Sequence, residues 1–199
     1  MTIFAPQDPN FEAGVRDSFA RLALMKTVGA RLLRVSPGEV EIDVPFRADL
    51  TQHHGFLAAA VQTAIVDVAC GYAAMTLMPP GGSVLTVEYK VNFLSPARGE
   101  RVLARGRVVR PGRTVTVCAG DVVALSEGRE QLVATLLATM ATVNVEGGRL
   151  PWTEVRAASE AARHVGLPQR SASRPTLPWC VCRGSGLRRR LKELVRPTP

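Results

Sequence analysis

The feature that most constrains the fold is an apolar run over residues 56–78, in which Asp67 is the one charged residue. Apolar side chains fall on every face of a helix with this sequence, so the run predicts a long helix buried on all sides. Residues 79–82, Pro-Pro-Gly-Gly, are expected to end it sharply. An isolated carboxylate in such a helix is costly unless something pairs with it or uses it.

A membrane span is the first alternative for a run of this length. It is disfavoured because Asp67 near the centre would cost roughly 2.5 to 3.5 kcal/mol on insertion scales. Much of the run is Ala, and alternating segments rather than a second span follow it. Residues 1–10 have no basic start and contain two prolines and an Asp, so no signal peptide is predicted and a cytoplasmic protein is expected.

Alternation of apolar and polar residues predicts strands on both sides of the long helix, as in Val40, Ile42 and Val44 between acidic residues. Residues 134–142 are rich in Ala, Leu and Met, as helices often are, but we interpret them as a strand. Short connections between successive strands imply an antiparallel sheet. We therefore predict an α+β fold, with five to six strands wrapped around a long central helix. The expected strands cover residues 30–35, 39–46, 83–94, 100–110, 114–125 and 131–145, preceded by an amphipathic helix over 10–25.

Charge divides the chain into two parts. Residues 1–149 carry 15 Lys/Arg and 14 Asp/Glu, whereas residues 150–199 carry 10 and 3. We predict a main domain over residues 1–145 and a basic, largely disordered extension over 146–199. Such a tail can contact nucleic acid or anionic membrane, but a solvated extension without that role is the interpretation we favour. The four cysteines lack metal-ligand spacing, so no metal site is predicted.

Several motifs stand in a specific order: His54-Gly55-Phe56, Asp67 followed by Ala69-Cys70-Gly71-Tyr72, Leu85-Thr86-Val87-Glu88-Tyr89, and Pro111-Gly112-Arg113. Together they resemble the PaaI-like acyl-CoA thioesterases, a family with the hotdog fold, over about residues 19–143. The resemblance implies hydrolysis of the thioester of an acyl- or aryl-acyl-CoA, with no metal and no cofactor beyond the coenzyme A of the substrate.

The resemblance also implies roles for individual residues. Asp67 matches the family's carboxylate, which attacks the thioester or activates water, and Thr86 matches a hydroxyl residue that helps to hold the water. Gln52 matches a polar amide that lines the site. The N–H of Ala59, at the start of the helix, is expected to hold the thioester oxygen, since helix N-termini have unpaired donors and positive dipole character.

The substrate and a partner chain complete the expected site. The resemblance places His54 and Gly55 in the substrate-binding loop, and Arg110 and Arg113 are candidates for the phosphates of coenzyme A. Asp67 lies roughly 12 Å along the axis from the helix start, so it cannot serve its own helix N-terminus. The geometry therefore requires two chains, and a homodimer or dimer of dimers is expected.

The chain departs from the family at Ala58 and Ala60, where close relatives have His and Gly. The departure removes an imidazole and favours an alternative function, a catalytically impaired hotdog module that binds acyl-CoA or acts as a scaffold. Interpretations without a catalytic or binding role also remain open. Asp67 would be a structural carboxylate paired with an arginine, Thr86 an ordinary strand residue, and the arginines and histidines solvated.

Overall fold

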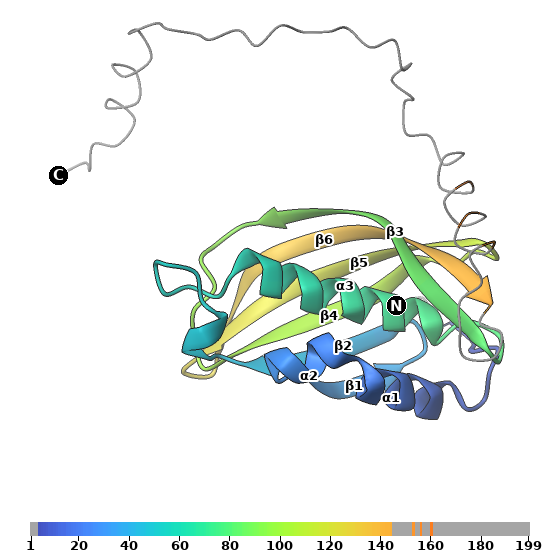
Figure 1. The fold of residues 1–199 in the computed structure, drawn as a ribbon, viewed down its shortest axis with the longest axis horizontal. Coiled ribbons are helices and arrows are strands. Elements are labelled where there is room, and N and C mark those ends of the chain that lie inside the picture. The colour runs from blue at the N-terminus through green and yellow to red at the C-terminus, as the bar shows by residue number, and fades with distance from the viewer. Residues whose placement is uncertain (1–3, 145–152, 154–155, 157–159, 161–199) are drawn as a thin grey trace, which may run out of the picture. The chain divides into compact units, whose positions relative to one another are not determined.

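The computed structural model describes residues 4–144 together with residues 153, 156 and 160. A six-stranded antiparallel sheet dominates this part of the chain, in the order β1-β2-β4-β5-β6-β3 (Figure 1). The predicted α+β hotdog architecture is confirmed, including the strand over 134–142. The strands are β1 (Arg31–Ser36), β2 (Glu39–Pro45), β3 (Gly82–Phe93), β4 (Arg101–Arg110), β5 (Val115–Ser126) and β6 (Arg129–Asn144).

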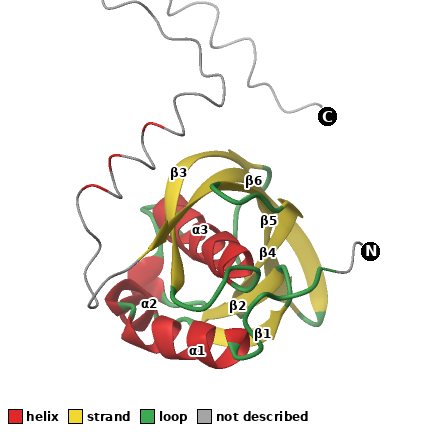
Figure 2. Cartoon of the chain, turned by 90° about the vertical axis from the view of Figure 1, so that its right-hand side faces the viewer, coloured by secondary structure: helices red, strands yellow, loops and turns green. Residues whose placement is uncertain are grey.

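The long helix α3 (Ala59–Met75) lies in the concave face of the curled sheet (Figure 2). A short 3-10 turn, η1 (Ala48–Leu50), belongs to the loop before it. The prediction that α3 is buried on all sides is wrong for the single chain. Ile65, Ala69 and Cys70 are fully buried, but Ala59 and Ala60 are exposed and Asp67 is only half-buried. The sheet buries only one side of α3. Because apolar residues lie on every face of this helix, its sequence does not show which side the sheet covers.

The N-terminal helix was expected to run without interruption over residues 10–25, and this prediction is wrong. The structure has two helices, α1 (Phe11–Arg21) and α2 (Ala23–Val28). Leu22 between them has an extended backbone, with φ −76° and ψ 102°. Gly29 ends α2 in the left-handed conformation that glycine adopts without strain. Figure 2 shows α1 and α2 along the side of α3 that the sheet leaves uncovered.

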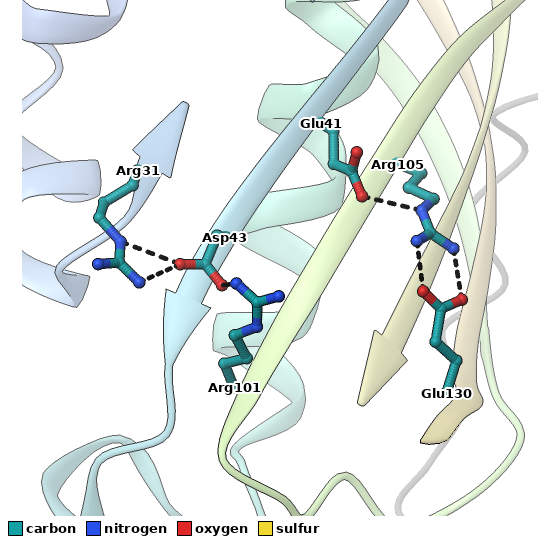
Figure 3. Close-up of polar contacts among 6 residues, drawn as sticks. All are labelled: Arg31, Glu41, Asp43, Arg101, Arg105 and Glu130. Carbon is teal, nitrogen blue, oxygen red and sulfur yellow. Dashed lines mark hydrogen bonds and ion pairs between the residues drawn. The ribbon is translucent and has the colours of Figure 1, made fainter. Parts of the chain in front are cut away.

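The outer face of the sheet carries ion pairs that join different strands (Figure 3). Asp43 on β2 is fully buried there, and the Nε of Arg31 donates to its Oδ2 at 2.9 Å. Arg101 on β4 lies 3.6 Å from its other oxygen. Arg105 pairs with both Glu41 and Glu130. Removing a partner of a buried charge is strongly destabilising, so Asp43 stabilises this register only together with its arginines.

The predicted extension over residues 146–199 lies outside the described residues, apart from residues 153, 156 and 160, which are helical. The predicted boundary at residue 145 therefore stays a prediction. No helix of the described residues is long and apolar enough to cross a membrane.

Two glycines allow α3 to approach the sheet closely. Gly106 on β4 and Gly120 on β5 are register partners under the middle of the helix. A Cβ at Gly106 would lie 2.3 Å from the carbonyl carbon of Ala69, and a Cβ at Gly120 would lie 2.5 Å from a methyl of Val66. Neither distance is compatible with an Ala side chain, so this pair fixes how deep α3 lies.

We expect Gly106→Ala to lower the free energy of unfolding by about 2 kcal/mol or more, because overpacking against backbone has no flexible group to yield. Gly120→Ala should cost less, since side chains can shift. Gly14→Ala is the control. It lies in α1, where a Cβ would have nothing within 4 Å, and it should gain up to about 1 kcal/mol from helix propensity. Urea unfolding measures all three, and equal stability of Gly106→Ala and wild type would contradict the close approach.

Candidate active site

Asp67 and Thr86 meet across the edge of the sheet. Asp67 is in the third turn of α3, and Thr86 is on β3, just before a register shift in the pairing of β3 with β6. The hydroxyl of Thr86 donates to Oδ1 of Asp67 at 2.9 Å. The structure therefore brings together the two residues that the resemblance matched to a carboxylate and its hydroxyl neighbour. Their catalytic roles stay a prediction.

The charge of Asp67 is not neutralised within the described residues, where it makes no ion pair. Burial raises the pKa of its carboxyl above the ordinary value, and the hydrogen bond from Thr86 offsets part of this shift. A carboxylate with a raised pKa is a stronger base. The arginine-paired carboxylate that sequence reasoning allowed for Asp67 is instead Asp43, on the opposite face of the sheet.

The start of α3 has unpaired donors. Its N-cap is Ala58, and no side chain caps it. The N–H groups of Val61 and Gln62 bond to the carbonyl of Ala58, whereas no such turn or cap bond in the described residues uses the N–H of Ala59. Because Ala59 is also exposed, this N–H can donate to a ligand, and the helix dipole favours negative charge there.

The predicted loop residues surround this helix start. The N–H of Gly55 donates to the carbonyl of Gln52 at 2.9 Å, and Gly55 has φ +77°, which explains glycine in this turn. The N–H of His54 donates to the side-chain oxygen of Gln52, and the rings of His53 and His54 lie 3.9 Å apart. Gln52, His54 and Ala59 line one cleft with the apolar residues that end β3.

Asp67 lines a different cleft, formed by α1, α3 and β3. Within one chain the predicted residues therefore fall into separate groups, with the helix start in one cleft and the carboxylate in the other. Arg113 lies in neither: it lines a third cleft with Leu77 and Met78, beyond the end of α3. Arg110 is exposed at the end of β4. The structure does not bring either arginine near Asp67 or Ala59.

Sequence reasoning missed three polar residues in these clefts. Gln62 is buried on α3 beside the helix start, where its amide donates to the carbonyl of Leu57 at 2.9 Å. Its side-chain oxygen is buried and has no partner in the described residues. Ser18 on α1 and Tyr72 on α3 line the cleft of Asp67. A polar residue within an apolar helix was the available signal, because buried Gln and Tyr need partners.

The described residues contain no group of three or more His, Cys, Asp or Glu side chains that could hold a metal ion. The arrangement around Asp67 consists of a carboxylate, the hydroxyl of Thr86 bonded to it, and a cleft lined by both apolar and hydroxyl side chains. Such a set can move a proton or attack a carbonyl carbon, provided that an oxyanion donor is supplied from elsewhere.

A curled antiparallel sheet around a central helix defines the hotdog fold, and comparison with known proteins agrees. Residues 54–130 match the thioesterase superfamily. A thioesterase family protein from Silicibacter pomeroyi is 48% identical, with a TM-score of 0.67, over 68% of this chain and 99% of that one. The chain belongs to the thioesterase superfamily, as its motifs predicted, and its family activity is that of a hydrolase.

More distant relatives support the same fold. The "Putative esterase VNG_1336C" of Halobacterium salinarum is 31% identical over 105 residues, which are 50% of this chain and 69% of that protein. The E. coli PaaI protein of the phenylacetic acid degradation operon is 15% identical, with a TM-score of 0.62 over 71% of this chain and 97% of its own. At that identity the likeness to PaaI concerns the fold.

The raised pKa of Asp67 predicts how stability depends on pH. Since the folded state binds the Asp67 proton more tightly than the unfolded state, this group favours folding below its ordinary pKa, and that contribution is lost as pH rises through the raised pKa. We therefore expect Asp67→Asn to melt at a higher temperature than wild type near about pH 7, by a few degrees at most, and the difference to shrink toward about pH 4. Calorimetry over this range measures it, and a difference that does not change with pH would contradict the shift.

Proposed function

We propose that this protein is an acyl-CoA thioesterase whose active site is shared by two chains, with Asp67 of one protomer facing the start of α3 of the other. One observation carries this proposal: the base and the oxyanion donor are each well formed, yet they occupy different clefts of one chain. The two lie roughly 12 Å apart along the helix axis, too far to act on one carbonyl group. A two-fold dimer would contain two such sites, each formed by Asp67 of one protomer and the start of α3 of the other.

The reaction is hydrolysis of a thioester and requires no cofactor. Asp67 takes a proton from water as the water oxygen bonds to the carbonyl carbon, and Thr86 helps to hold the water and carboxylate. The N–H of Ala59 donates to the oxyanion that forms. The C–S bond then breaks, and the proton held by Asp67 passes to the coenzyme A thiolate, which gives the thiol and a carboxylic acid. Direct attack by Asp67 on the carbonyl carbon, through an anhydride that water hydrolyses, is the other route that this carboxylate supports.

Uncommitted arginines offer a place for coenzyme A. Arg110 and Arg113 are exposed, and neither forms an ion pair with the described residues. They are close in the turn between β4 and β5, so they suit the phosphates of the nucleotide part. His54 and Gly55, in the loop beside the helix start, suit the pantetheine arm.

A binding or scaffold module is the second candidate function, and the helix start favours it. Ala58 and Ala60 replace the His and Gly of close family relatives, so one side-chain donor is lost and a methyl group is added near the expected thioester. A module of this kind would bind acyl-CoA without turnover. The backbone donor at Ala59 persists in either case, since it depends on no side chain.

Complementation between two inactive variants tests the shared site. Asp67→Asn keeps the shape but cannot act as base or nucleophile, and should lower kcat by on the order of 10²-fold or more. Ala59→Pro removes the proposed oxyanion donor at the first helical position, where proline is tolerated, and should lower kcat by about 10²-fold. Release of thiol from acyl-CoA measures both.

When the two variants are unfolded, mixed and refolded together, half of the dimers should be mixed. Each of these has one intact composite site, so roughly a quarter of wild-type activity should return. Refolding each variant separately is the control. If the mixture stays as inactive as its components while light scattering shows dimers, the two groups do not act across the interface. If Asp67→Asn retains full turnover, the chemistry lies elsewhere.

Restoring the family residues separates an enzyme from a binding module. In the double variant Ala58→His, Ala60→Gly, an added donor near the oxyanion should raise kcat by on the order of 10²-fold when its geometry holds. The new Gly should cost up to about 1 kcal/mol of helix stability, and less in the first turn. The same pair of changes in Asp67→Asn should give no gain. A double variant that folds, binds acyl-CoA and turns over no faster would favour the binding module.

A further inference from the structure

The cleft that contains Asp67 extends away from it along α3. Asp67, Gly71 and Met75 follow one another at four-residue intervals and so share one face of the helix. Thr86 and Val84 on β3 form the facing wall, since a Cβ at Gly71 would lie 3.5 Å from a methyl of Val84. The cleft holds ≈ 210 Å³. A group attached to a carbonyl carbon at Asp67 would therefore lie between α3 and β3.

The third wall comes from the N-terminal helices. Ser18 on α1 and Leu22, at the break between α1 and α2, line the cleft opposite β3. The extended backbone at Leu22 ends α1 at this point. The break between α1 and α2 therefore contributes to the wall of the cleft, which the sequence did not reveal. Both residues belong to the same chain as Asp67, so this wall is present in each protomer.

Two hydroxyls pair with each other in the lining of this cleft, apart from Asp67, Thr86 and Ser83, which also line it. The Oγ of Ser18 and the hydroxyl oxygen of Tyr72 lie 3.1 Å apart, and either can donate to the other. Tyr72 is only 8% exposed, and the ring of Phe19 packs against it at a centroid distance of 6.0 Å. The pair shares two hydroxyl protons, of which its mutual bond uses one. The other proton can be donated to an acceptor in the cleft.

The charge near this hydroxyl pair selects among acceptors. Burial raises the pKa of the Tyr72 hydroxyl, which therefore keeps its proton at neutral pH. The nearby Arg21 pairs with Asp17 on the exposed side of α1, so its charge is already matched. A neutral oxygen acceptor fits the hydroxyl pair, whereas a second carboxylate would sit in the same cleft as Asp67.

We propose that this cleft is the acyl subsite, and that it selects short acyl groups carrying a neutral oxygen, as a keto or hydroxyl group, at the end far from the thioester. The inference rests on the proposed thioesterase function. Ser18 and Tyr72 bind the distal oxygen of the acyl group. Tyr72 lies about 7.5 Å beyond Asp67 along the helix axis, which sets a short reach.

The test compares pentanoyl-CoA with levulinoyl-CoA, which differs by one keto oxygen near the end of the acyl chain. Wild type should have the higher kcat/KM for levulinoyl-CoA, on the order of tenfold, because a partly buried hydroxyl pair left without its acceptor penalises the plain chain. Tyr72→Phe and Ser18→Ala should each bring this ratio toward one. Acetyl-CoA does not reach the pair, so each change should lower kcat/KM less for acetyl-CoA than for levulinoyl-CoA.

Matched variants exclude unspecific effects. Tyr89→Phe removes the other tyrosine hydroxyl of the chain, on the exposed part of β3, and should leave the ratio unchanged. Gly71→Leu should fill the cleft and raise KM for both five-carbon substrates. Equal kcat/KM for the two substrates in wild type, or a ratio that survives both Tyr72→Phe and Ser18→Ala, would overturn the inference.

Binding separates this inference from the proposed function. Calorimetric titration of Asp67→Asn with each intact acyl-CoA requires no turnover. Tighter binding of levulinoyl-CoA than pentanoyl-CoA, lost in the additional Tyr72→Phe change, would support the subsite even if wild type hydrolysed no thioester. Hydrolysis of acetyl-CoA with equal affinity for the two longer substrates would support the thioesterase and overturn the subsite.

Discussion

The contact between α3 and the glycine pair of the sheet sets the position of everything in the candidate site. Ala69 and Cys70 lie against Gly106, where a single methyl group would not fit. Asp67 precedes Ala69 by two residues, which turns it roughly 200° around the helix axis. The same close packing that buries one side of α3 therefore presents Asp67 on the other side, next to Thr86. A helix held further from the sheet would not place the carboxylate within hydrogen-bond distance of β3.

Two carboxylates of this chain show how surroundings separate structure from chemistry. Asp43 is the more deeply buried, but Arg31 and Arg101 supply opposite charge and keep it a structural ion pair. Asp67 is partly exposed, has a neutral hydroxyl as its partner, and lies in a cleft. The negative charge of Asp67 is therefore less stabilised than that of Asp43, because no opposite charge is paired with it. A proton or an electrophile can reach it.

Local patterns predicted the fold because each element is consistent with its own sequence. Alternation predicted strands such as β2 and β4, and β6 was interpreted as a strand although its composition is typical of a helix. The pairing of Asp67 with Thr86 came from the resemblance to a family rather than from spacing. The contact between Ser18 and Tyr72 joins residues 54 positions apart, and no local period carries such information. The break at Leu22 is likewise a tertiary feature, since the apolar spacing of α1 continues through it.

The main error of sequence reasoning was the prediction that α3 is buried on all sides, and the cause of this error is physical. The hydrophobicity of a surface indicates that it is buried, but it does not indicate whether a sheet, a substrate or a second chain buries it. The faces of α3 at Ala59, Ala60 and Asp67 are apolar enough to be buried, yet the single chain leaves them partly open. An apolar helix with an incompletely covered face is the pattern expected of a chain that is completed by a partner.

The start of α3 is also incomplete in the single chain, because not all of its hydrogen-bond donors have partners. A Ser, Thr, Asp or Asn at position 58 would cap the helix and stabilise it by about 1 kcal/mol. Ala58 makes no such bond, and the N–H of Ala59 remains open toward the cleft that Gln52 and His54 line. Ala58 therefore supplies no side-chain donor but does not close the site. The N–H of Ala59 is at the first helical position and precedes the N–H groups that a capping side chain would bond. It can therefore stabilise an oxyanion without any side chain.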